Sequence, residues 1–111
     1  MKSKIVAAAA FAALLAPSVV MADSDYPFTI YNNSTRYPII GFQTYEGGRW
    51  VIWDVTSLPP GQRATFNWET NEGVCSIRFR IIYSNYEPTE QTMDFCQRHS
   101  IIVTDTDVTQ R

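Results

Sequence analysis

The chain is poor in the residues that most often carry catalysis or bind metals. Of its 111 residues, one is histidine (His99) and two are cysteine (Cys75 and Cys96). Zinc and copper sites need clustered imidazole or thiolate ligands, and nucleophilic catalysis needs a nucleophile, a base and an orienting group in contact. The chain has no G-x-S-x-G motif, and we interpret His99 as a surface histidine in a turn. We therefore predict no catalytic residue, no metal and no cofactor.

Calcium is the remaining metal to consider, because it binds carboxylate and carbonyl oxygens. Asp105-Thr106-Asp107 places two carboxylates close together, but the D-x-[DN]-x-[DN]-G loop is missing. We interpret these acids as part of a solvated polar tail.

Lysine is absent after residue 4, and basic charge is sparse. Without residues 1–22 the chain has 7 arginines against 11 acidic residues, a net charge of −4. Only Arg78 and Arg80 are spaced to share one face of a strand. Binding to nucleic acid needs a concentrated basic surface that neutralises several phosphates. We therefore expect no nucleic-acid partner.

The longest apolar run is short and lies at the N-terminus. Lys2 and Lys4 precede an apolar stretch at 5–16, and Val20-Met21-Ala22 stands directly before Asp23. This layout is typical of a secretory signal peptide cleaved after Ala22. An uncleaved membrane anchor is the alternative, but spanning a bilayer takes roughly 20 apolar residues. We predict a signal peptide at 1–22, no stable membrane insertion after cleavage, and a periplasmic or secreted protein.

The remaining 89 residues suffice for one small domain, which we place at 23–104 and follow with a polar tail at 105–111. In an oxidising compartment an even set of cysteines normally pairs. We therefore predict a disulfide between Cys75 and Cys96, buried in the core.

No sustained helical period follows Ala22, whereas short β-rich runs alternate with turn residues. Gly47-Gly48 is suited to a tight hairpin, and Pro60-Gly61 to a type II turn. Further turns are expected at 32–35 and 70–73. The predicted strands are seven, at 26–31, 37–45, 49–55, 63–69, 75–83, 91–97 and 100–104.

Residues in these runs alternate between apolar and polar, as in the segment from Cys75 to Tyr83. Such half-buried alternation is typical of antiparallel sheets. The sequence therefore predicts an all-β fold, a small antiparallel β-sandwich of about seven strands with one disulfide, either immunoglobulin-like or a partly open barrel.

Three short motifs carry a resemblance. Residues 28–33 read F-T-I-Y-N-N, residues 58–61 read L-P-P-G, and Asp94-Phe95-Cys96 lies near the end. Together with Cys75 on a strand, they resemble a loose group of small exported β-domain proteins of Gram-negative bacteria. The resemblance implies a periplasmic β-domain and assigns no role to any residue.

Two classes of function follow from the remaining side chains. Asp54, between Trp53 and Val55, is the one acid embedded in an apolar segment. A small periplasmic hydrolase using Asp54 and a second carboxylate is therefore the alternative function.

The leading expectation is a non-catalytic protein that binds a protein or a glycan in the cell envelope or outside the cell, because 14 aromatic residues follow the signal peptide. The hairpin tip, where Tyr45 and Trp50 come together beside Arg49, is the predicted centre of this site. Its oligomeric state is left open. The candidate binding residues are Tyr45, Arg49, Trp50, Tyr83 and Tyr86.

Overall fold

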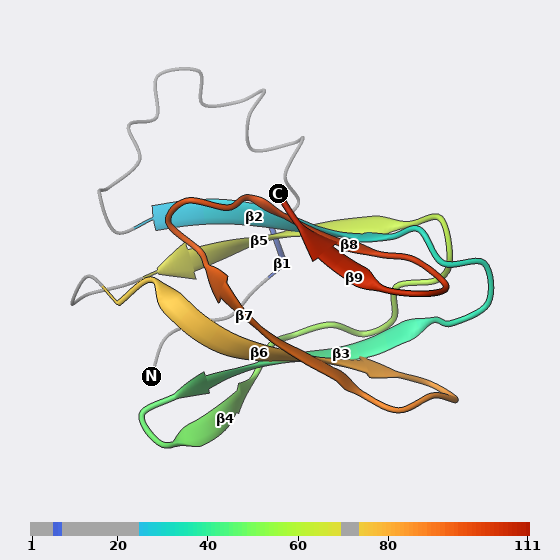
Figure 1. Cartoon of the computed structure of the whole chain (residues 1–111), viewed down its shortest axis with the longest axis horizontal. Helices are drawn as coiled ribbons and strands as arrows, with labels where there is room; N and C mark the ends of the chain where they lie inside the picture. The colour runs from blue at the N-terminus through green and yellow to red at the C-terminus, as the bar shows by residue number, and fades with distance from the viewer. Residues whose placement is uncertain (1–5, 8–24, 70–73) are drawn as a thin grey trace.

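The computed structural model describes residues 6–7, 25–69 and 74–111, and these form two β-sheets packed face to face (Figure 1). The first sheet has the strand order β1-β5-β2-β8-β9, and the second β4-β3-β6-β7. The strands are β1 (Val6–Ala7), β2 (Asp25–Asn32), β3 (Ile39–Glu46), β4 (Arg49–Ile52), β5 (Arg63–Glu69), β6 (Ser76–Tyr83), β7 (Thr89–Asp94), β8 (Ser100–Val103) and β9 (Val108–Gln110).

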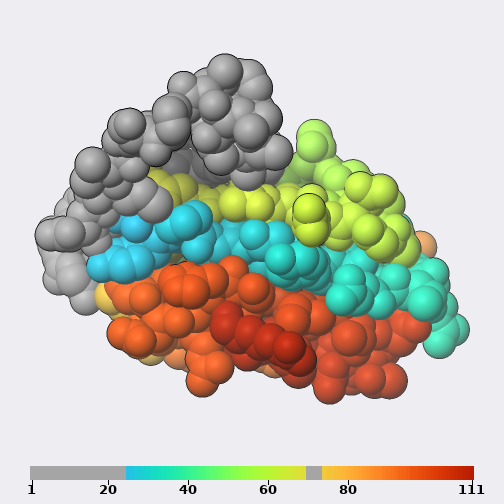
Figure 2. Space-filling view, turned by 90° about the horizontal axis from the view of Figure 1, so that it is seen from above, coloured from blue at the N-terminus to red at the C-terminus, as the bar shows by residue number. Residues whose placement is uncertain are grey.

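The predicted β-sandwich is confirmed, but among the described strands one pair is parallel. β2 and β8 run in the same direction, with Thr29 opposite Ser100, whereas the other pairs are antiparallel. Parallel neighbours need a long crossover, which the second sheet and β5 supply here. Figure 2 shows the outer side of the first sheet, with β5, β2 and the β8–β9 segment side by side.

Aromatic rings from both sheets fill the space between them. Phe28 of β2 lies 5.7 Å from Phe42 and 5.4 Å from Trp53, measured between ring centroids. It also lies 4.9 Å from Phe95, in an edge-on arrangement. Eight of the 14 aromatic side chains that follow the predicted signal peptide are buried, which leaves six half-buried or exposed. Most of the apparent aromatic surplus is therefore core.

The turns predicted from glycine are present. Gly47 and Gly48, between β3 and β4, have φ angles of 59° and 81°, and Gly61 has a φ of 86°. These values lie in the left-handed region, which glycine adopts without steric cost. Several strand ends differ from the prediction by up to three residues. β7, for example, ends at Asp94 because the Asp94 side chain caps the following turn.

The buried amide of Asn32 joins the end of β2 to two loops. Its nitrogen donates to the carbonyl oxygens of Tyr37 (2.9 Å) and Leu58 (2.8 Å). Its oxygen accepts hydrogen bonds from the backbone and the hydroxyl of Ser34. All four hydrogen-bonding positions of the amide are thus satisfied without solvent.

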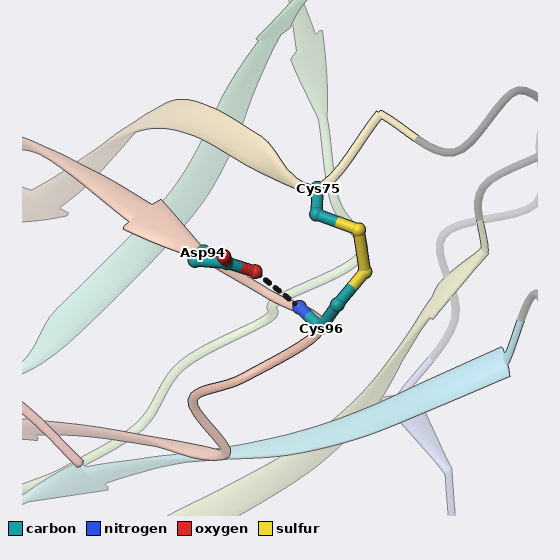
Figure 3. Close-up of side chains that lie close together, drawn as sticks. All are labelled: Cys75, Asp94 and Cys96. Atoms are coloured by element: carbon teal, nitrogen blue, oxygen red, sulfur yellow. Dashed lines mark hydrogen bonds between the residues drawn. A yellow bond between two sulfur atoms is a disulfide. The ribbon is translucent and has the colours of Figure 1, made fainter.

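Cys75 and Cys96 form the predicted disulfide, with a Cα–Cα distance of 5.4 Å (Figure 3). The bridge joins the residue before β6 to the turn after β7. Both cysteines are only half-buried, so the prediction of a bridge within the core was wrong. Cys75 does follow the inward alternation of its strand, but it lies at the end of the sheet, beyond the packed rings.

The C-terminal segment is part of the sandwich. The predicted polar tail contains β9, which pairs with β8 and buries Val108. The side-chain nitrogen of Gln110 donates to the side chain of Gln91 and to the carbonyl of Thr92, both on β7 (2.9 Å each). These bonds connect the two sheets at this edge.

Two predictions fall mainly outside the described residues. Of the predicted signal peptide, only Val6–Ala7 is described, as β1 paired antiparallel with β5. The cleavage site after Ala22 and the predicted turn at 70–73 lie outside the described residues.

Replacing Cys75 with alanine should lower the free energy of unfolding by about 2 to 5 kcal/mol, since the bridge restricts the unfolded chain. Urea denaturation of oxidised wild type, Cys75→Ala and Cys96→Ala measures this. The two variants should be equally destabilised. Two free thiols in denatured, unreduced wild type would contradict the bridge itself.

Replacing Asn32 with leucine should lower the free energy of unfolding by about 2 to 4 kcal/mol, because two buried carbonyl groups lose their donor. Asn33, which is exposed, supplies the matched control. Asn33→Ala should change stability by less than about 0.5 kcal/mol. Equal effects of the two substitutions in thermal denaturation would contradict a central role for Asn32.

Candidate functional site

Tyr45 and Trp50 lie opposite each other on the outer face of the second sheet. The pairing of β3 with β4 sets them side by side, with ring centroids 5.2 Å apart and ring planes at 63°. Tyr45 is exposed and Trp50 half-buried. The predicted meeting of these two rings is therefore present, on a sheet face that is open to solvent.

Two arginines from β6 cover these rings. The guanidinium carbon of Arg78 lies 5.1 Å from the ring centroid of Tyr45 and 5.3 Å from that of Trp50. The same atom of Arg80 lies 3.9 Å from the Trp50 centroid. We call Tyr45, Trp50, Arg78 and Arg80 the aromatic–arginine cluster. Cation–π attraction holds it together.

Glu90 of β7 fixes the two arginines unequally. Arg80 approaches the Glu90 carboxylate to 3.2 Å and also donates to the side chain of Gln43. Arg78 reaches Glu90 at 3.4 Å through one terminal nitrogen, and its side chain is 52% exposed, compared with 27% for Arg80. Arg80 is thus held in place, whereas Arg78 keeps donors that face solvent.

Two exposed aliphatic side chains lie in the same two strands, further from the β3–β4 turn than Tyr45 and Trp50. Ile52 of β4 is 73% exposed, and it lies opposite Gln43 in the same register that aligns Tyr45 with Trp50. Ile40, at the start of β3, is 44% exposed. The outer face of β4-β3-β6 therefore combines apolar, aromatic and cationic groups.

The five predicted binding residues do not form one site. Arg49 is exposed at the hairpin tip, and strand alternation directs its side chain to the opposite face from Trp50. Tyr83 is buried, and Tyr86 lies in the loop after β6, at the other end of the sandwich from the β3–β4 hairpin (Figure 1). Arg78 and Arg80 take the place predicted for Arg49.

Tyr83 and Tyr86 belong to a second feature, a cleft of about 290 Å³ between the β6–β7 loop and the β8–β9 turn. Tyr37 completes a group of three rings there, at 4.9 Å from Tyr86 and 6.3 Å from Tyr83 between centroids. Asp105 and Asp107 line the cleft as well. We call this feature the tyrosine cleft.

Asp54, the acid considered for hydrolysis, is exposed on the structure. Its neighbours Trp53 and Val55 point toward the core, so the apolar segment around Asp54 lies on the other side of the backbone. Asp54 does not line the tyrosine cleft. Asp54 follows the end of β4 at Ile52, and its two apolar sequence neighbours do not bury it.

Cys75, Asp94 and Cys96 bring three side chains of metal-binding type within 4.8 Å of one another (Figure 3). The two sulfurs are bonded to each other and so do not serve as thiolate ligands. The Asp94 carboxylate accepts the backbone N–H groups of Cys96 (3.0 Å) and Gln97 (3.2 Å). This arrangement is a capped turn beside a disulfide.

Within residues 6–7, 25–69 and 74–111, no helix is long and apolar enough to cross a membrane.

Burial raises the pKa of the Tyr83 phenol above its ordinary value of 10.0, an effect that the nearby Tyr86 reinforces and a hydrogen bond to Thr89 partly offsets. Unfolded chains then ionise at Tyr83 before folded ones do. The contribution of the Tyr83 phenol to the free energy of unfolding is therefore fully present below pH 10.0, and it is lost as the pH rises through the folded pKa.

Tyrosinate absorbance should accordingly show a late-ionising component in the folded protein that Tyr83→Phe removes. Tyr86→Phe is the control and should leave this component in place. A late component that persists in Tyr83→Phe would contradict the assignment.

No family model matches the chain, and no curated protein or solved structure is significantly similar to it. The resemblance to exported β-domain proteins therefore stays a prediction from short motifs, and the function has to be argued from the residues themselves.

Proposed function

We propose that this chain is an exported, non-catalytic β-sandwich protein that binds a protein partner through the outer face of the β4-β3-β6-β7 sheet. One observation carries the proposal. The aromatic–arginine cluster lies on that face together with two exposed isoleucines, Ile52, two residues from Trp50 on β4, and Ile40, at the opposite end of β3 from Tyr45.

The composition of the face favours a protein partner over a glycan. Tryptophan, tyrosine and arginine are the residues enriched at the centres of protein interfaces. Sugars stack on open aromatic faces, whereas Arg80 lies directly over the ring of Trp50 at 3.9 Å. A partner surface complementary to this face would place apolar side chains against Ile40 and Ile52 and a carboxylate against Arg78.

Stabilisation of the sheet explains only part of this arrangement. Exposed cation–π pairs contribute about 0.5 to 1 kcal/mol each, so the cluster also supports the fold. Ile52, however, is 73% exposed and adds little to the packing. The solvent-facing side of an antiparallel sheet is ordinarily polar. The exposed apolar side chains on this face therefore support the proposal that it binds a partner.

The proposed location follows from the signal-like N-terminus and the disulfide. A small domain with a disulfide is typical of oxidising compartments, which include the periplasm and the cell exterior. The sparse basic charge supports a partner other than nucleic acid.

A photo-crosslinking amino acid at Ile40, introduced in the producing cell, tests the proposal. It should give one discrete heavier product, because a bound partner covers this side chain. Ile52→Glu should abolish the product without unfolding the domain, since it places a charge in the apolar part of the interface. The double variant Tyr45→Ala/Trp50→Ala should do the same while the domain stays folded.

Matched controls are a crosslinker at Thr109 and the variant Thr109→Glu, because Thr109 is exposed on β9 of the other sheet. The first should give no product, and the second should leave the Ile40 product intact. No discrete product at Ile40, or one that persists in Ile52→Glu, would refute the proposed interface.

A further inference from the structure

The tyrosine cleft has one apolar wall and one polar wall. Tyr37, Tyr83 and Tyr86 form the apolar wall, and the β8–β9 turn at 104–107 forms the polar one. A larger depression of about 430 Å³ beside Leu58 and Pro59 has no aromatic side chain in its lining. The two-walled construction distinguishes the tyrosine cleft from that depression.

The wall formed by the three tyrosines is buried at Tyr83 and exposed to solvent at Tyr86. Tyr83 is buried and its hydroxyl pairs with Thr89 at 3.2 Å. Tyr86 is 60% exposed and leans on Tyr37 and Tyr83, with centroids 4.9 Å and 6.1 Å away. In the described part of the chain, the hydroxyls of Tyr37 and Tyr86 have no hydrogen-bond partner. This wall offers ring surface together with unpaired hydroxyls.

The polar wall holds two carboxylates in fixed positions. Asp105 accepts hydrogen bonds from the backbone N–H and the hydroxyl of Thr35, at 2.7 Å and 2.6 Å. Asp107 accepts the hydroxyl of Thr104 at 2.8 Å through one oxygen, and the backbone of the same two residues closes the turn. Each carboxylate keeps lone pairs for a further donor. The turn therefore presents preorganised acceptors to the cleft.

The charge and shape of the tyrosine cleft restrict the class of ligand that it can bind. Two of the residues lining the cleft are acidic and none is basic, which disfavours an anion, although a basic side chain beside the cleft, Arg36, lies over the Tyr37 ring at 5.6 Å from its centroid. The three rings pack directly on one another, so they form a wall and leave no cage around a cation. A neutral molecule with an apolar face and several hydroxyl donors matches both walls.

We propose that the tyrosine cleft binds a short neutral saccharide. One sugar ring packs its C–H face on the exposed ring of Tyr86, and its hydroxyls donate to Asp105 and Asp107. The volume of about 290 Å³ is at the lower end of small-molecule sites, which fits a chain end or a short oligosaccharide. This site is separate from the proposed protein-binding face and does not depend on it.

Titration calorimetry of the purified exported protein tests the site with defined probes. The neutral probes are disaccharides of glucose, of galactose and of N-acetylglucosamine, and the charged probes are trigalacturonate and tetramethylammonium. At least one neutral disaccharide should bind. Tyr86→Ala and Asp107→Asn should each weaken that binding at least about tenfold, since they remove the stacking surface and an ionised acceptor.

Tyr86→Phe keeps the ring and should retain most of the binding, and Tyr45→Ala, on the other site, should leave it unchanged. Thermal denaturation of each variant confirms that the domain is folded. Binding of no neutral disaccharide would overturn the proposal, as would binding that neither Tyr86→Ala nor Asp107→Asn weakens. Binding of tetramethylammonium alone would assign the cleft to cations instead, and binding of trigalacturonate alone would assign it to anions.

Discussion

The packing of aromatic rings between the two sheets is the interaction on which the rest of the structure depends. Phe28 contacts rings from both sheets, including Phe42 and Phe66, and joins them into one continuous cluster. Burying a large aromatic side chain contributes roughly 1.5 to 3 kcal/mol, and a domain of this size has few other sources of stability. The disulfide and the amide of Asn32 secure the ends of the sandwich around this cluster.

The same core determines which aromatic side chains are left for recognition. Strand alternation sends Phe42 and Val51 inward and therefore Tyr45 and Trp50 outward, on the solvent side of β3 and β4. Tyr83 is the last of the β6 side chains that point toward the core, and it also lines the tyrosine cleft. The two proposed binding sites are thus the outer face of one sheet and an end of the core.

Local patterns in the sequence were sufficient for part of this picture. Glycine pairs and period-two alternation predicted the β3–β4 hairpin and the fold class, because turn chemistry and burial are short-range signals. The disulfide was predicted from the pair of cysteines in a chain expected to be exported. Arg78 and Arg80 were correctly expected on one strand face. Their contact with Trp50 depends on β6 pairing with β3, which is more than 25 residues away in the chain, and no local pattern encodes that register.

The differences between the predictions and the structure arise from long-range contacts of this kind. β9 was interpreted as a polar tail because only Val108 among its residues is apolar, and its pairing with β8 is a tertiary event. The parallel β2–β8 pair likewise has no signature in either strand. Asp54 and Arg49 were selected for their sequence neighbours, whereas those neighbours point to the opposite side of the backbone.

The central claim is that the inner rings hold the fold while the outer rings, together with the arginines over them, bind a partner. Equilibrium denaturant unfolding of Phe28→Ala and of the double variant Tyr45→Ala/Trp50→Ala tests it most directly. Phe28→Ala should lose about 3 to 5 kcal/mol of unfolding free energy. The outer double variant should lose about 2 kcal/mol or less, although it removes two rings. A loss in the outer variant equal to that of Phe28→Ala would show that both sets of rings are framework and would contradict the account.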